Sequence, residues 1–195
     1  MSEFTLHTLD SAPKSSQQLL NRTKQQLGFI PNLLAVMAES TSTLKAYQEL
    51  SNLFDKTAFT VTERQLVLLS ISRFRNCCYC LAAHGTVAGI QKIPQQIIDA
   101  VYYKQPLADN KLEALRTFTH SVLDAEGWAK PEDLQAFYKA GYQKQHVLEV
   151  ILGISLKTLS NYVNHINDTP IDAEFISGIP NNQHADTTQI EAVSN

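Results

Sequence analysis

All three cysteines of the chain lie in one stretch of sequence, Asn76-Cys77-Cys78-Tyr79-Cys80-Leu81-Ala82-Ala83-His84. Residues at positions i and i+3 or i+4 share a face of a helix, so Cys77, Cys80 and His84 are expected side by side. Cys78 would point about 100° away from them. Disulfide-stapled domains spread their cysteines to close long loops, and this cluster is too tight to do so. The stretch therefore predicts thiol or metal chemistry rather than a stabilising cross-link.

The segments on both sides of this stretch show helical rather than alternating periodicity, with most glycines and prolines at their ends. We expect helices over residues 15–26, 33–39, 44–56, 63–75, 77–90, 94–103, 112–126, 131–139 and 143–166. Thr62 and Gln65 fit a capping box at the start of the fourth helix. Five apolar residues of the last helix are expected to face inward: Val147, Ile151, Ile154, Tyr162 and Ile166. No strand pattern is present, so the sequence predicts an all-α fold of about eight helices.

We expect a single helical domain over residues 1–169, with its core in 25–169. The polar, aperiodic residues 170–195 are expected to form an arm that is ordered at first and frays towards Asn195. Segments 67–72 and 150–155 resemble each other, which indicates two helical pseudo-repeats. The alternative is that two buried helices share a similar composition.

Composition excludes several classes of protein. The chain has 195 residues, of which 44% are hydrophobic and 18% charged, so it can bury a sizeable core and is not disordered. A net charge of −3 with interspersed signs gives no nucleic-acid footprint. No apolar run approaches the ~20 residues of a membrane span. No secretory signal is visible, so we expect a cytoplasmic protein.

The cysteine cluster favours redox chemistry. A helix N-terminus and a neighbouring histidine lower the pKa of a cysteine in a C-x-x-C motif. One thiolate then attacks a peroxide or a disulfide, and the second thiol resolves the product. Two alternatives remain open: inert core cysteines, and a zinc site formed by Cys77, Cys80 and His84 with a distant fourth ligand such as His165.

The run from Thr62 to Leu66 and the motif Cys77-x-x-Cys80-x-x-x-His84 resemble the carboxymuconolactone decarboxylase superfamily, in its alkylhydroperoxidase D-like, peroxidase-related branch. Residues 28–33 and 161–165 are also similar to that branch. The resemblance implies an all-helical homo-oligomer, trimer or hexamer, that reduces hydroperoxides through a redox-active Cys77–Cys80 disulfide. It also implies re-reduction by an external dithiol, a lipoyl protein or a thioredoxin-like protein, with no bound cofactor or metal.

The resemblance further implies roles for individual residues. Cys80 would attack, Cys77 would resolve, and His84 would shuttle protons. The family has a glutamate twelve residues before the first cysteine, where this chain has Gln65, which can orient His84 but cannot stabilise its charged form. Glu149, on an otherwise apolar stretch, is our candidate for the missing carboxylate; the alternative is a surface or interface role.

Three further residues are candidates for the substrate pocket: Tyr79, Asn161 and His165. Tyr79 could donate a hydrogen bond to a bound peroxide, or could simply pack in the core. Two other functions remain open for the whole chain. One is a non-catalytic thiol redox sensor or oligomeric interaction protein. The other is a carboxymuconolactone decarboxylase-like enzyme, whose chemistry does not need the C-x-x-C motif.

Overall fold

The computed structural model describes residues 4–180, and this part of the chain is helical without strands. It contains nine α-helices and one 3-10 helix: α1 (Lys14–Leu27), α2 (Asn32–Met37), α3 (Thr41–Phe54), α4 (Val61–Phe74), α5 (Cys78–Ile90), α6 (Gln95–Tyr102), α7 (Asn110–Asp124), α8 (Pro131–Lys139), α9 (Lys144–Asn167) and η1 (Ala173–Gly178). The all-α prediction is confirmed, and every predicted helix end lies within three residues of the observed one. None of the helices in residues 4–180 is long and apolar enough to span a membrane.

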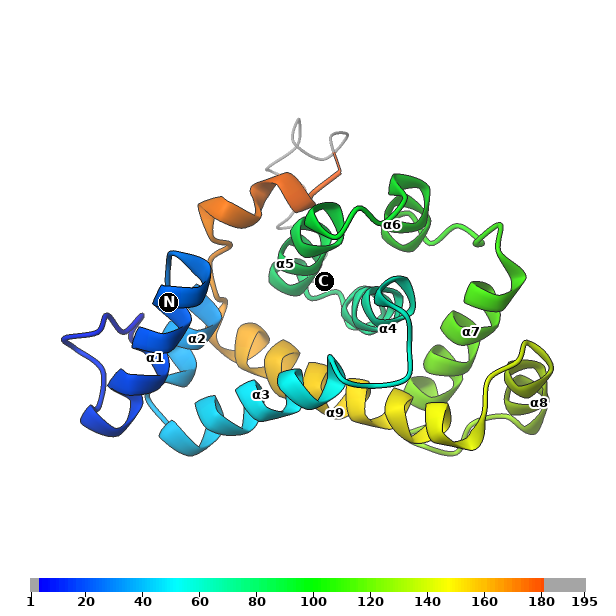
Figure 1. Cartoon of the computed structure of the whole chain (residues 1–195), viewed down its shortest axis with the longest axis horizontal. Coiled ribbons are helices and arrows are strands. Elements are labelled where there is room, and N and C mark those ends of the chain that lie inside the picture. The colour runs from blue at the N-terminus through cyan, green and yellow to red at the C-terminus, as the bar shows by residue number, and fades with distance from the viewer. Residues whose placement is uncertain (1–3, 181–195) are drawn as a thin grey trace.

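Helices α4 and α5 lie in the middle of the molecule, and α9 runs beside them along one long side (Figure 1). The 24-residue α9 packs against α2, α3, α4, α5 and α7. Gly153 allows the crossing with α3 and α4, because a Cβ there would collide with the side chains of Phe54 and Val67. A single helix can therefore present residues to both the N-terminal and the central helices.

The start of α4 differs from the prediction by two residues. Thr60, not Thr62, is the N-cap, and it forms a reciprocal capping box with Glu63. The Glu63 carboxylate also accepts a hydrogen bond from Tyr142 at 2.9 Å and pairs with Lys111 at 2.9 Å. The prediction was wrong because Thr62 satisfies the local pattern, whereas these distant partners favour Glu63 as the third helical residue.

A tight turn joins α4 to α5 and fixes the position of the cysteine stretch. Asn76 has a left-handed backbone (φ 53°), a conformation that asparagine tolerates better than most residues. The Arg73 guanidinium donates to the Asn76 side chain at 2.8 Å, and the Cys77 amide donates to the Ser72 carbonyl at 2.9 Å. Cys77 therefore becomes the N-cap of α5, and the next three residues form its first turn.

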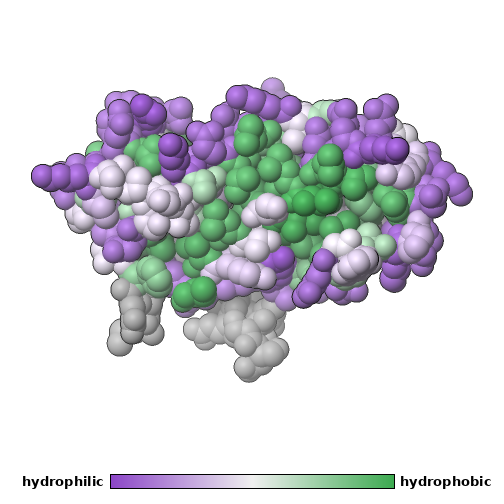
Figure 2. Space-filling model, turned by 90° about the horizontal axis from the view of Figure 1, so that it is seen from below, coloured by the Kyte–Doolittle hydropathy of each residue, from purple (hydrophilic) through white to green (hydrophobic). Residues whose placement is uncertain are grey.

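The exposed side of α9 is more apolar than its sequence suggested. Ile151, Tyr162 and Ile166 were predicted to face inward, but they are 45%, 53% and 75% exposed, so that prediction was wrong. With Leu148, also exposed, they form what we call the α9 apolar face. Figure 2 shows apolar side chains gathered over the side of the molecule along which α9 runs.

The proposed pseudo-repeats differ in their helices. The first spans α4 and α5, which are separated by a turn, whereas the second lies within the unbroken helix α9.

The C-terminal arm packs against α5 as far as the description extends, and residues 181–195 of the predicted arm lie outside it. The Tyr102 hydroxyl donates to the Gly178 carbonyl at 2.9 Å. The Asp172 carboxylate accepts the backbone amide of Asn32 at 3.1 Å, so it caps the start of α2 from 140 residues away. The arm therefore connects the start of α2 with α5 and α6.

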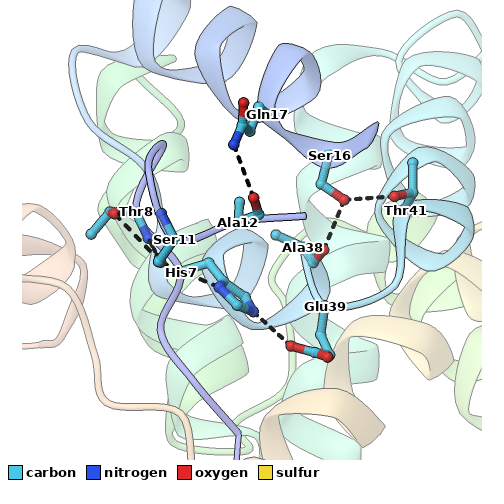
Figure 3. A network of polar contacts seen from close by, with 9 residues as sticks. All are labelled: His7, Thr8, Ser11, Ala12, Ser16, Gln17, Ala38, Glu39 and Thr41. Carbon is cyan, nitrogen blue, oxygen red and sulfur yellow. Dashed lines mark hydrogen bonds and ion pairs between the residues drawn. The ribbon is translucent and has the colours of Figure 1, made fainter. Parts of the chain in front are cut away.

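The N-terminal segment is held against the loop between α2 and α3 by side-chain contacts (Figure 3). The His7 ring lies 2.7 Å from the Glu39 carboxylate. The buried Ser16 hydroxyl donates to the Ala38 carbonyl at 2.7 Å and lies 2.7 Å from the Thr41 hydroxyl. These contacts fix α1 against the helices that cover the cysteine stretch.

A close approach between α5 and the arm gives a testable prediction. A Cβ at Gly85 would collide with the backbone of Gly178, whereas a Cβ at Gly89 on the same helix meets nothing within 4 Å. Gly85→Ala should lower the free energy of unfolding by about 2 kcal/mol. It should also speed amide hydrogen exchange in η1.

The control variant Gly89→Ala should leave stability unchanged or raise it by up to about 1 kcal/mol, because alanine favours a helix over glycine. Chemical denaturation and hydrogen exchange measure both variants. Equal stability of the two would show that the backbone contact does not hold the arm.

Candidate functional site

The three cysteines occupy two different environments. Cys77 and Cys80 are both only 1% exposed, whereas Cys78 is exposed at the start of α5. All three are free thiols. This separation follows from helical spacing: Cys77 and Cys80 lie on the face of α5 that packs inward, and Cys78 does not. The buried pair is therefore the candidate reactive centre.

Polar residues of α9 meet the buried sulfur atoms. The Asn164 amide nitrogen lies 3.2 Å from the Cys80 sulfur and 3.8 Å from the Cys77 sulfur. The Ser160 hydroxyl lies 3.8 Å from the Cys80 sulfur. Asn164 and Ser160 are themselves buried. Cys80 thus has two polar neighbours from α9, in a region otherwise closed to water.

A buried lysine completes these surroundings. Lys157, one helical turn before Asn161, is only 1% exposed. Its ammonium group is close enough to Cys80 to act on the sulfur by charge and hydrogen bonding. None of the ion pairs in the described part of the chain involves Lys157. A buried ammonium requires an anion or strong acceptors, so the sulfur of Cys80 is its counterpart.

These contacts separate the acidities of the two thiols. Burial raises the pKa of Cys80, but the hydrogen bond from Cys77 and the charge and hydrogen bond of Lys157 outweigh burial and hold it well below its ordinary value. The pKa of Cys77 is raised by the hydrogen bond to Cys80 and by burial. The arrangement therefore favours a Cys80 thiolate that accepts a hydrogen bond from a Cys77 thiol.

His84 and Gln65 are brought together, as the family resemblance implied. The Nδ1 atom of the half-buried His84 lies 3.2 Å from the Gln65 side-chain oxygen. Burial, with the nearby charge of Lys157, lowers the pKa of His84 well below its ordinary value. The imidazole is therefore neutral at pH 7. Gln65 orients this ring through Nδ1, which leaves Nε2 as the acceptor nitrogen.

Glu149 lies elsewhere on α9. Its Oε1 atom accepts the backbone amide of Ala58 at 3.0 Å, before the start of α4. Eight residues, about 12 Å of helix, separate it from Lys157. The structure therefore does not bring Glu149 to the cysteine pair or to His84, and the glutamate supports the loop that precedes α4.

The three residues predicted for a substrate pocket are placed differently from one another. The Tyr79 hydroxyl is buried and donates to Asp172 at 2.6 Å while accepting the Leu33 amide, so it joins α5 to α2 and the arm. His165 is exposed, and no group of three metal-ligating side chains occurs in residues 4–180. Asn161 is fully buried, and neither polar atom of its amide has a hydrogen-bond partner.

Three residues of this centre were missed from the sequence: Lys157, Ser160 and Asn164. Together with Asn161 they recur at helical spacing and form a buried polar row along α9. The recurrence is present in the sequence, but the apolar residues Ile151, Tyr162 and Ile166 of the same helix favour the opposite face as the buried one. A polar row at core spacing in an apolar segment is the signal that could have identified them.

Comparison with solved structures identifies the fold. No family model matches the sequence, and no curated protein does. Among solved structures, an "alkylhydroperoxidase AhpD core" protein, a peroxidase-related protein from Ralstonia eutropha JMP134, is similar with a TM-score of 0.80. The match covers 92% of this chain and 97% of that chain at 21% identity. The chain therefore has the AhpD-like helical fold.

Two further structures support the same fold. A peroxidase-related protein from Silicibacter sp. TM1040 has a TM-score of 0.76 and 20% identity, covering 89% of this chain and 95% of that chain. The debrominase Bmp8, as a cysteine-to-alanine variant in complex with 2,3,4-tribromopyrrole, has a TM-score of 0.75 and 17% identity. That match covers 91% of this chain and 97% of that chain.

The contact between Asn164 and the sulfur atoms predicts an effect on thiol ionisation. Asn164→Asp replaces an amide donor with a carboxylate beside Cys80, and a like charge disfavours the thiolate. The pKa of Cys80 should rise by about 1 to 3. As the pH is lowered, its thiolate should therefore become protonated at a higher pH than in the unmodified chain. Thiolate absorbance near 240 nm measures the midpoint.

The matched control is Asn52→Asp, which adds the same charge at an exposed position on α3. It should leave the midpoint of the thiolate titration unchanged. If both variants titrate like the unmodified chain, Asn164 does not act on the sulfur.

Proposed function

We propose that the chain is a thiol-dependent peroxidase and disulfide oxidoreductase that uses Cys77 and Cys80. The observation that carries this proposal is the buried pair itself: both sulfur atoms are nearly inaccessible, and the Asn164 amide lies 3.2 Å from Cys80. The pKa of Cys80 is lowered and that of Cys77 is raised, which favours one thiolate beside one thiol. A nucleophilic sulfur next to a thiol is what two-step thiol redox chemistry needs. Similarity of fold to peroxidase-related proteins agrees with this assignment.

The proposed cycle begins at Cys80. Its thiolate attacks a hydroperoxide, which yields an alcohol and a Cys80 sulfenic acid. The Cys77 thiol then displaces water to form the Cys77–Cys80 disulfide. Both cysteines are nearly inaccessible in the reduced chain, which favours a small oxidant over a bulky one. His84, oriented by Gln65, accepts and returns protons through Nε2.

A second reaction must regenerate the pair. The proposal requires an external dithiol, a lipoyl protein or a thioredoxin-like protein, which reduces the disulfide by thiol exchange. It requires no bound cofactor, because the two sulfur atoms carry both electrons. A cytoplasmic setting is proposed with it, since cytosolic reductants keep such thiols reduced.

We also propose that the chain self-associates through the α9 apolar face. Four large side chains are exposed there along one helix: Leu148, Ile151, Tyr162 and Ile166. Exposed apolar clusters of this kind mark interaction surfaces on water-soluble proteins. The polar side of the same helix holds Asn164 and Lys157, so association would also stabilise the helix that carries the site.

Reductive debromination is a second candidate function for the same thiols. The fold similarity to a debrominase, whose structure with a brominated pyrrole carries a cysteine-to-alanine change, favours it. In such a reaction a carbon–bromine bond is replaced by carbon–hydrogen. The Cys80 thiolate and the Cys77 thiol supply two electrons as they become a disulfide, the Cys77 proton goes to carbon, and bromide is released.

Thiol counting during peroxide turnover tests the proposed function. Pre-reduced protein mixed with tert-butyl hydroperoxide in a stopped-flow instrument should lose two thiols per chain rapidly. Cys80→Ser should abolish the reaction, because it removes the nucleophile. Cys77→Ser should stop at a trapped sulfenic acid, and the matched control Cys78→Ser should react like the unmodified chain.

Other outcomes have definite meanings. Thiols that exchange with a small disulfide but ignore peroxide would contradict the peroxidase and support a redox sensor. Bromide release from a brominated pyrrole without peroxide consumption would favour the debrominase. Trapping of sulfenic acid in Cys80→Ser instead would reverse the roles of the two cysteines.

Self-association is tested by a charge on the α9 apolar face. Ile166→Glu should shift the chain towards its monomer mass of 21.8 kDa in sedimentation velocity, because a charge opposes burial of this surface. Ile90→Glu is the control, because Ile90 is equally exposed, at 75%, on α5. A monomeric unmodified chain would contradict the proposal.

A further inference from the structure

Lys157 is a proton-carrying group that the cycle described above leaves unused. Lys157 is only 1% exposed and lies one helical turn before Ser160, whose hydroxyl is 3.8 Å from the sulfur of Cys80. Its ammonium acts on that sulfur, the proposed nucleophile, by charge and hydrogen bonding. It lies on the same face of α9 as Asn164, whose amide contacts that sulfur at 3.2 Å. Lys157 is therefore adjacent to the point where the oxygen–oxygen bond of a hydroperoxide would break.

Attack on a hydroperoxide creates a need for a proton donor. Breaking the oxygen–oxygen bond leaves the electron pair on an alkoxide, a strongly basic leaving group. His84 is neutral at pH 7, and its Nδ1 atom is occupied by Gln65. A neutral imidazole is a poor acid, and a glutamine cannot supply charge to make it a better one.

The other titratable groups around the sulfur do not fill this role. Cys77 on α5 must keep its proton to act as the resolving thiol. Tyr47 on α3 has its pKa raised by burial and by the charge of Cys80, which makes it a weaker acid than usual. None of the side-chain hydrogen bonds of Cys80 and His84 within residues 4–180 involves a carboxylate.

We propose that Lys157 is the catalytic acid that protonates the departing oxygen of the hydroperoxide, an inference that rests on the proposed peroxidase function. The same ammonium that pairs with the Cys80 thiolate before the reaction transfers its proton when that negative charge moves to oxygen. Lys157 thereby takes the place of a carboxylate-assisted histidine in a chain that has Gln65.

The proton and electron balance closes over one cycle. A sulfur–oxygen bond forms at Cys80, the oxygen–oxygen bond breaks, and Lys157 gives a proton to the alkoxide, which leaves as an alcohol. The Cys77 thiol attacks the sulfenic acid, a sulfur–sulfur bond forms, and water leaves. An external dithiol then reduces the disulfide by supplying two electrons and two protons. One proton restores the Cys77 thiol, and the other restores the Lys157 ammonium beside the Cys80 thiolate.

Two oxidants with different leaving groups separate proton donation from thiolate stabilisation. An alkoxide leaves tert-butyl hydroperoxide and needs a proton, whereas the stable thiolate that leaves an aromatic disulfide such as 5,5′-dithiobis(2-nitrobenzoate) needs none. Every protein compared carries Cys78→Ser, so that the exposed thiol of Cys78 does not react with the disulfide. Rate constants are compared at the plateau of each pH profile, where Cys80 is fully ionised. In Lys157→Met the peroxide plateau should fall about 100-fold. The disulfide plateau should change by less than about threefold.

A second variant and a control sharpen the result. Lys157→Arg keeps a positive charge but cannot release its proton, so it should hold the ionisation midpoint of Cys80 low while the peroxide plateau still falls. Lys144→Met, an exposed lysine at the start of α9, should behave like the unmodified chain. Circular dichroism verifies the fold of each variant, and Lys157→Arg carries the test if Lys157→Met does not fold.

Each outcome decides between specific statements. If the unmodified chain consumes peroxide and both Lys157 variants keep its peroxide plateau, Lys157 is not the acid, and the peroxidase proposal stands. If both oxidants slow equally in Lys157→Met, its role is structural, and proton donation is overturned. If the unmodified chain reacts only with the disulfide, the peroxidase function itself fails.

Discussion

An ammonium group removed from water costs several kcal/mol unless an anion and hydrogen-bond acceptors meet it, and in this fold Lys157 is met by sulfur. That constraint accounts for the rest of the centre. It stabilises the charge on Cys80, adds to the effect of burial in lowering the pKa of His84, and requires α9 to turn its polar row inward. The cost of burying the lysine is offset only while the thiolate is present. Stability and reactivity are thus linked at one pair of groups.

Local patterns in the sequence were sufficient to predict most of the fold. Apolar periodicity, with glycine and proline at segment ends, located nine α-helices to within three residues. Helical spacing alone separated the buried pair, Cys77 and Cys80, from exposed Cys78. The contact between Gln65 and His84 was implied by the family resemblance and not by spacing, since the two residues lie on different helices. These features depend on residues close in sequence or on a single turn between adjacent helices.

The remainder depends on contacts between distant segments. Lys157 meets Cys80 across 77 positions, and Asp172 caps α2 across 140. Periodicity correctly placed Val147 and Ile154 against the core. It placed Ile151, Tyr162 and Ile166 on the wrong side, because the C-terminal part of α9 buries its polar row and exposes apolar residues. Polar residues inside and apolar residues outside are expected where one face of a helix serves a site and the other an interface. Propensity cannot reveal that arrangement, because it depends on what each face meets.

The ionisation of each cysteine is the quantity on which this account depends. We would follow the ¹³Cβ chemical shifts of Cys77, Cys78 and Cys80 by NMR in the reduced, selectively labelled chain between pH 5 and pH 10, roughly bracketing the usual thiol range. The account predicts that Cys80 alone is a thiolate at pH 7 and that Cys77 stays protonated throughout. Three protonated thiols at pH 7, or ionisation of Cys77 before Cys80, would contradict it.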